Sequence, residues 1–214
     1  MKAHRSAFDE TQGQWVRMMG SERDGKSRRS AGRPRPVTAD WLFRAAAHYL
    51  ERYASSSDNL ARVLARKIER RRRAAIEAGE PIEADEGSEE RDRAMISDTI
   101  AKFLELKLLD DRAYAEARFA SLRRRGTSLR QTEAKLGQKG VPRELRQAVA
   151  AQDEMGDAAA ALAYARRRRL GPHRAADRQT RRDRDIAAMM RAGFSFRDSV
   201  GAIDGTGEAP DEPS

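Results

Sequence analysis

Leu50-Glu-Arg-Tyr-Ala-Ser-Ser-Ser-Asp-Asn-Leu-Ala-Arg-Val-Leu64 returns later in the chain as Leu122-Arg-Arg-Arg-Gly-Thr-Ser-Leu-Arg-Gln-Thr-Glu-Ala-Lys-Leu136, and this repetition decides the fold. The two stretches align Leu50 with Leu122, Ser56 with Ser128 and Leu64 with Leu136. Both aligned serines suit the start of a helix, and apolar residues at helical spacing follow them. A repeat longer than one helical hairpin predicts small helical units laid end to end.

A second, shorter repeat joins two later segments. Gly140-Val-Pro-Arg-Glu and Gly193-Phe-Ser-Phe-Arg each begin with a glycine that ends one helix, followed by an apolar residue and the start of the next helix. Arrays of such units expose long surfaces. They therefore favour binding to other macromolecules over enclosure of a small substrate.

Apolar residues with helical spacing recur along the chain, as in Leu60, Val63, Leu64 and Ile68, and no strand pattern competes with them. The sequence therefore predicts an all-α fold of about nine helices, arranged as tandem three-helix repeats. We expect a disordered basic tail at 1–36, repeats at 37–109 (with an acidic insertion near 74–92), 110–153 and 154–204, and a disordered acidic tail at 205–214.

Composition points to thin helical layers and an anionic partner. Hydrophobic residues make up 39% of the 214 residues and charged residues 36%, with a formal net charge of +9. The mean hydropathy is -0.84, so a large apolar core is not expected. A basic chain attracts negatively charged partners over a long range. The absence of cysteine suits a reducing cytoplasm, and no apolar run reaches the roughly 18 residues of a membrane span.

The residues that usually carry catalysis are sparse. The histidines are His4, His48 and His173, and none has metal-ligand spacing with another. Asp110 and Asp111 could form a paired carboxylate, but helix capping explains both more simply. A glycine-rich phosphate loop is also absent. We therefore expect no enzymatic activity, no catalytic residue, no metal and no cofactor.

Three runs of arginine carry the functional hypothesis. Each lies near the end of an expected helix, where cations complement the helix dipole, and this structural role explains part of every run. Their recurrence in each repeat would nonetheless create separated basic patches, suited to phosphates or acidic side chains. We expect Arg123, Arg124 and Arg125 to be solvated, so that reversing their charge leaves the fold intact. The contact candidates are Arg70, Arg71, Arg72, Arg73, Arg123, Arg124, Arg125, Lys139, Arg166, Arg167, Arg168 and Arg169.

Reading of base sequence is not favoured by this chain. Aromatic residues make up only 6% of it, too few for a platform that stacks bases. A helix-turn-helix at 128–149 offers only Arg143, Arg146 and Gln147 to base edges. A basic DNA-binding protein of the nucleoid-associated or transcriptional kind remains the main alternative. A scaffold without nucleic acid is a third reading, in which the arginines serve solubility alone.

Taken in order, four short motifs resemble the RecX family of regulatory proteins, which modulate the RecA recombinase. The resemblance covers about residues 39–204. The motifs are Tyr49-Leu50 through Ser56 to Leu64; Leu108-Leu-Asp-Asp111 followed by Tyr114-Ala115; Gly126 through Leu136 to Lys139-Gly140-Val141; and Gly193-Phe194-Ser195. The segment 70–93 lengthens the first repeat relative to the family, and Met190-Arg191 stands where the family has leucine-arginine.

The resemblance implies a curved, elongated body that binds in the groove of the RecA–DNA filament. Such a protein hinders filament growth, ATP hydrolysis, strand exchange and LexA cleavage, and so modulates recombination, DNA repair and the SOS response. We accordingly expect a cytoplasmic monomer that binds the RecA nucleoprotein filament, with possible direct contact to nucleic acid. Dependence on RecA separates this reading from a plain DNA-binding protein.

Overall fold

The computed structural model describes residues 36–79 and 87–205, and every regular element in these two ranges is a helix. The predicted all-α class and the count of about nine helices are confirmed for this part of the chain. The predicted tails, apart from Pro36 and Gly205, and residues 80–86 of the expected insertion lie outside it. In chain order the elements are α2 (Ala39–Leu50), α3 (Ser57–Glu77), α4 (Ser88–Glu105), α5 (Asp111–Arg124), α6 (Leu129–Gln138), α7 (Arg143–Ala150), α8 (Gly156–Arg168), the short 3₁₀ helix η1 (Gly171–His173), α9 (Arg178–Arg191) and α10 (Phe196–Asp204).

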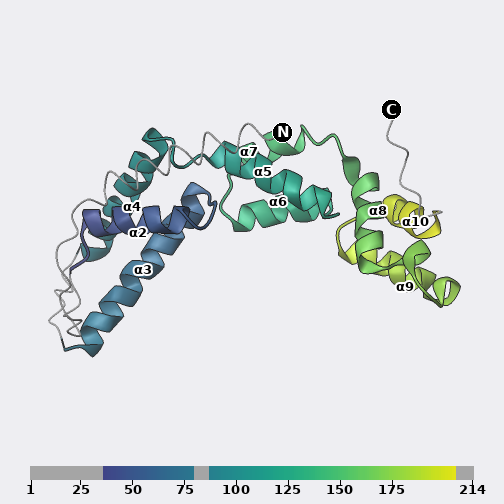
Figure 1. Ribbon diagram of the computed structural model, residues 1–214, viewed down its shortest axis with the longest axis horizontal. Helices are drawn as coiled ribbons and strands as arrows, with labels where there is room; N and C mark the ends of the chain where they lie inside the picture. The colour runs from purple at the N-terminus through teal and green to yellow at the C-terminus, as the bar shows by residue number, and fades with distance from the viewer. Residues whose placement is uncertain (1–35, 80–86, 206–214) are drawn as a thin grey trace. The chain divides into compact units, whose positions relative to one another are not determined.

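The helices pack in three groups of three (Figure 1), which we name the first (α2–α4), second (α5–α7) and third (α8–α10) triplet. Each triplet has its own apolar cluster, built around Phe103 in the first, Phe119 in the second and Met189 in the third. Small separate cores agree with the low hydrophobic content of the chain. The exact boundaries of the repeats and the curvature of the array stay predictions.

The repeated sequence positions have the same structural roles in the first two triplets. Ser56 and Ser128 are the N-caps of α3 and α6, and each hydroxyl accepts a hydrogen bond from the backbone N–H three residues later. Leu64 and Leu136, eight residues further on, are fully buried. The sequence repeat therefore corresponds to a repeated helix start followed by a repeated core position.

Other helix starts also follow the expected local chemistry. Asp110 caps α5 by accepting a hydrogen bond from the backbone N–H of Ala113 at 2.9 Å. Ser195 caps α10 by accepting one from the N–H of Asp198 at 3.0 Å. Pro142 is the N-cap of α7, one residue before the helix begins at Arg143.

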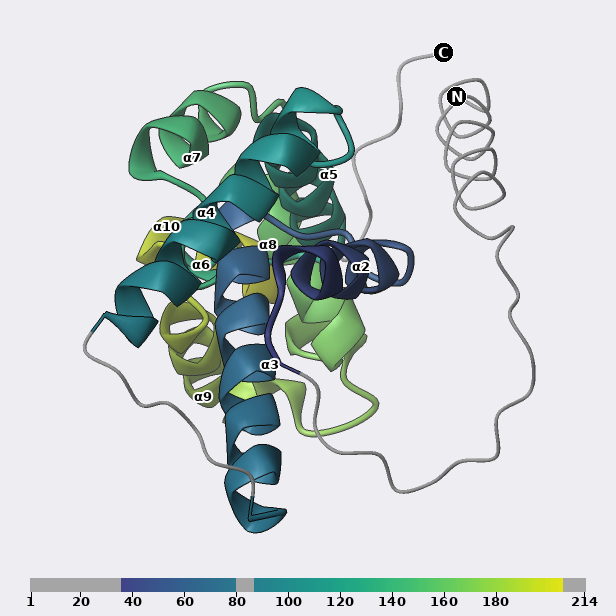
Figure 2. The same ribbon diagram turned by 90° about the vertical axis from the view of Figure 1, so that its left-hand side faces the viewer.

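The first triplet is lengthened by its two long helices. α3 continues through Glu77 and α4 begins at Ser88, so both ends of the expected insertion are helical. The C-terminal turns of α3 extend past α2 (Figure 2) and carry the arginine run at 70–73. An ion pair of 2.8 Å between Arg72 and Asp92 links these turns to the start of α4.

Candidate functional site: basic clusters and the joints between triplets

Most of the candidate contact residues lie exposed at helix ends. Arg124 is the last residue of α5, and Arg166–Arg168 form the last turn of α8. Cations there face the negative end of the helix dipole, so helix structure alone accounts for part of their placement. The exposed candidates are Arg70, Arg73, Arg124, Arg125, Lys139, Arg166, Arg167, Arg168 and Arg169.

Two further candidates are half-buried against the first triplet. The guanidinium of Arg71 lies 4.5 Å from the centre of the Trp41 ring, a cation–π distance. Arg72 is held by its ion pair with Asp92. Both side chains therefore help to attach α3 to its neighbours, and Arg70 and Arg73 are the more accessible members of this run.

Arg123 corrects the expectation from sequence. It was expected to be solvated together with Arg124 and Arg125, but its side chain is only 2% exposed. Its Nε donates a hydrogen bond to Asp153 at 2.9 Å, and its Nη1 donates to Asp157 at 2.6 Å and to the carbonyl of Thr127 at 2.8 Å. Arg123 is therefore a structural residue of the interior and cannot present its charge to a partner. Helix geometry explains the difference, because neighbouring residues point about 100° apart.

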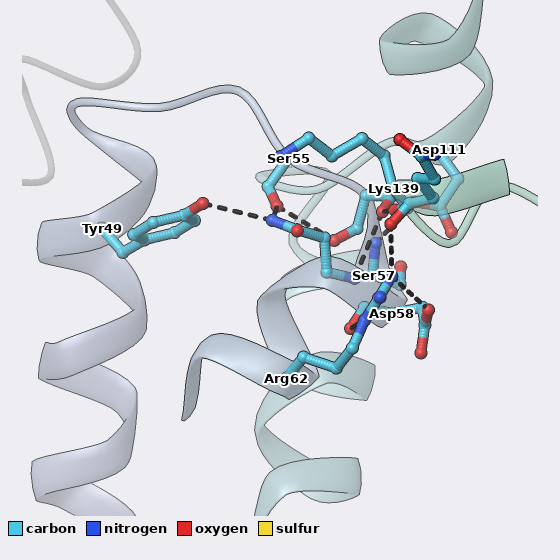
Figure 3. A network of polar contacts seen from close by, with 10 residues as sticks. Tyr49, Ser55, Ser57, Asp58, Arg62, Asp111 and Lys139 are labelled. Atoms are coloured by element: carbon cyan, nitrogen blue, oxygen red, sulfur yellow. Dashed lines mark hydrogen bonds and ion pairs between the residues drawn. The ribbon is translucent and has the colours of Figure 1, made fainter. Parts of the chain in front are cut away.

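The first and second triplets meet at a contact that we call the first joint (Figure 3). The hydroxyl of Ser56 donates a hydrogen bond to the carbonyl of Lys139. The N–H of Ser57, at the start of α3, donates to the carboxylate of Asp111 at 2.7 Å. On the exposed side, Arg62 donates to the carbonyl of Gln138 at 3.2 Å. Asp111, which helix capping explained from the sequence, thus also binds the preceding triplet.

The same arrangement recurs between the second and third triplets, at the second joint. The hydroxyl of Ser128 donates to the carbonyl of Ala192 at 2.7 Å, as Ser56 does to Lys139. The N–H of Leu129 donates to Asp157 at 2.8 Å, as that of Ser57 does to Asp111. At each joint, groups of the following triplet accept hydrogen bonds from the start of α3 or α6. The N–H that donates there would otherwise lack a partner, because the first N–H groups of a helix have no acceptor within it.

A glycine completes each joint. Gly140 and Gly193 follow the two accepting carbonyls and have φ values of +76° and +89°. A Cβ at Gly193 would lie 2.6 Å from the Ser128 hydroxyl oxygen, and one at Gly140 would collide with the Asp58 side chain. The two glycines of the shorter sequence repeat are thus required by both the left-handed backbone and the close approach of the neighbouring triplet.

An apolar groove of about 610 Å³ lies between α3 and α4 and reaches the first joint. Ala61 and Ala65 on one side face Ile96, Ile100 and Leu104 on the other, and Ser57, Asp58 and Arg62 line it as well. In the second triplet the Arg146 guanidinium approaches within 2.6 Å of the position that a Cβ at Gly137 would occupy. The aligned position in the first triplet, Ala65, lies in the open groove instead.

The described residues contain no group of three or more His, Asp or Glu side chains that could hold a metal ion. Within the same ranges, no helix is both long and apolar enough to span a membrane. The residues that sequence reasoning missed are the joint acids Asp111, Asp153 and Asp157. Asp111 and Asp157 act between triplets, and Asp153, in the segment between α7 and α8, pairs with Arg123. The alignment of Ser56 with Ser128 marked where the contacts between triplets lie.

The described residues form consecutive helical triplets that carry exposed basic side chains. Comparison with known proteins gives the family of the chain. The chain is 40% identical over 185 residues to the regulatory protein RecX of Myxococcus xanthus, a match that covers 85% of this chain and 94% of that protein. It is also 44% identical over 92 residues to the regulatory protein RecX of Agrobacterium fabrum, covering 42% of this chain and 49% of that protein. The chain belongs to the RecX family of regulatory proteins.

Two other comparisons found nothing. No protein-family profile matches the chain, and no solved structure matches it. The resemblance seen in the four sequence motifs is confirmed by the long match to the Myxococcus protein. A regulatory role follows for this chain.

Proposed function

We propose that this protein binds the RecA–DNA filament in the cytoplasm as a monomer and inhibits RecA without catalysing a reaction. The observation that carries the proposal is the 40% identity to a regulatory protein RecX over 85% of the chain. Binding in the filament groove would hinder filament growth, ATP hydrolysis, strand exchange and cleavage of LexA. Recombination, DNA repair and the SOS response would be modulated in consequence.

The distribution of charge supports such binding. Exposed arginines lie in all three triplets, as at Arg70, Arg125 and Arg168. A filament of protein and nucleic acid offers phosphates and acidic side chains at many points along its length. Several separated basic clusters on one chain can bind such a partner at more than one point, which raises the overall affinity without any single strong contact.

A time course of ATP hydrolysis by RecA on single-stranded DNA tests the proposal. We expect hydrolysis to fall at amounts well below one molecule of this protein per RecA, because blocking a growing filament needs few copies. The control is binding of the protein to the same DNA without RecA. Unchanged hydrolysis at equimolar protein would exclude the RecA reading. If the protein also bound naked DNA tightly, that result would favour the plain DNA-binding alternative.

A further inference from the structure

The two joints share one design but differ in a buried ion pair. At the second joint, Asp157 accepts hydrogen bonds from both the N–H of Leu129 and the guanidinium of Arg123. At the first joint, Asp111 accepts from the N–H of Ser57. The residue aligned with Arg123 is Glu51, which is exposed and lies 3.5 Å from His48 on its own helix. The first joint therefore lacks the buried arginine of the second.

We propose that Arg123 is a positioning residue, which with Asp153 and Asp157 fixes the third triplet against the second and leaves the first joint as the point of flexure. Arg123 reaches three acceptors from a site that is 2% exposed. A guanidinium with a fixed fork of donors holds its partners in one geometry, whereas single hydrogen bonds tolerate rotation. The contacts between triplets at the first joint are separate hydrogen bonds from Ser56, Ser57 and Arg62, and the Arg62 side chain is exposed.

The ion pair between Arg123 and Asp157 also joins α5 and α8, two helices that carry basic clusters at their C-terminal ends. Arg123 lies next to Arg124 at the end of α5, and Asp157 lies in the first turn of α8, whose last turn is Arg166–Arg168. Fixing Arg123 to Asp157 therefore sets the spacing between these clusters. A partner contacted by both clusters gains from a fixed spacing, because binding at the first places the second at a high effective concentration.

The absence of cysteine allows spin labels to be placed at chosen positions in the full chain. Ala117, Arg66 and Gln179 are exposed and lie on α5, α3 and α9. Labels at Arg66→Cys with Ala117→Cys span the first joint, and labels at Ala117→Cys with Gln179→Cys span the second. Pulsed electron paramagnetic resonance then gives the distribution of label-to-label distances. We expect a narrower distribution across the second joint than across the first.

Arg123→Met should broaden the distance distribution across the second joint to the width found across the first joint. The distribution across the first joint should stay unchanged. Asp153→Asn, which keeps Asp157 as a partner, gives an intermediate width and serves if Arg123→Met fails to fold. Arg123→Lys keeps the charge without the fork and should restore the width only in part. Helix content by circular dichroism accompanies each variant. Equal widths at the two joints of the parent, or an unchanged second joint in folded Arg123→Met, would overturn the proposal.

The consequence for binding rests on the proposed function and is measured separately. Affinity for RecA filaments on single-stranded DNA should fall about tenfold or more in a folded variant with a broadened second joint, because the two clusters then act independently. A broadened joint with unchanged affinity would refute the positioning role. If the parent protein failed to bind filaments, the proposed function would be wrong. The distance measurements would still show whether Arg123 fixes the second joint.

Discussion

Buried charges are the main residue-scale feature of the third triplet as well as of the second joint. Asp185 is 2% exposed, and each of its carboxylate oxygens accepts a hydrogen bond of 2.6 Å from Arg174. The N–H of Gly171 also donates to it, at 2.9 Å. The hydrogen bond from Arg174 lowers the pKa of Asp185, and burial opposes that shift only in part. This pair attaches η1 to α9, so its protonation state bears on stability.

We expect the ion pair between Asp185 and Arg174 to make the free energy of unfolding depend on pH. A carboxyl group whose pKa is lowered by folding stabilises the protein at pH values above its unfolded pKa of about 3.9. That contribution is lost as the pH falls through the folded pKa. Asp185→Asn should therefore cost about 2 kcal/mol at neutral pH and progressively less below about pH 4.

Urea unfolding followed by circular dichroism from pH 7 to pH 2.5 checks this prediction on parent and variant side by side. Other carboxylates titrate equally in both proteins, so only the difference between them reports on Asp185. A difference that stays constant over the whole range would show that the charge of Asp185 contributes nothing.

At the scale of elements, each joint uses the start of one helix and the end of another. Ser128 caps α6 and at the same time donates to the carbonyl that precedes Gly193, between α9 and α10. A single hydroxyl thus serves a local and a long-range purpose. Substitutions that disturb a joint should therefore lower the free energy of unfolding more than substitutions at positions within a helix that make no such contact.

Gly193→Ala and Gly201→Ala form a matched pair for this comparison. Gly193 has φ +89°, and an added Cβ would lie 2.6 Å from the Ser128 hydroxyl oxygen. The left-handed strain and the disturbed hydrogen bond together should destabilise by about 2 kcal/mol. Gly201 lies within α10, where an added Cβ meets nothing within 4 Å. Alanine there should stabilise by about 0.5–1 kcal/mol. Thermal and urea unfolding give both values, and a shift of the same sign in both variants would contradict the role assigned to the joint.

On the scale of the whole molecule, exposed arginines are spread over all three triplets. The burial of Arg123 means that a test of the second cluster must leave that residue intact. Arg124 and Arg125 are exposed and have no part in the joint. Their reversal therefore separates a loss of contact from a loss of structure.

The double variant Arg124→Glu with Arg125→Glu should bind RecA filaments more weakly and with a smaller dependence on salt. Each phosphate contact that is lost reduces the number of counterions released on binding. Arg44→Glu with Arg112→Glu is the control, since both residues are exposed, lie outside the clusters and change the net charge equally. Affinity is measured at low and moderate salt, with circular dichroism to verify the fold. Equal behaviour of the two double variants would mean that net charge alone, and not this cluster, drives binding.

Local sequence determined the helices and the class of the fold. The serines at 56, 128 and 195 and Asp110 start helices because their side chains reach backbone N–H groups within one turn. Apolar spacing likewise placed Leu64 and Leu136 in cores. The repeat further indicated consecutive triplets and the RecX family. These features depend on neighbours in the chain, so they can be read from it.

Tertiary structure alone decided which charges face solvent and which hold the triplets together. Arg123, Arg124 and Arg125 are identical letters, yet only the first meets two carboxylates that lie about 30 residues further along the chain. Asp111 and Asp157 look like ordinary first-turn acids until a preceding triplet brings an N–H against each. Burial and pairing between distant segments depend on how the helices pack. The sequence of an arginine run therefore does not indicate which of its members is buried.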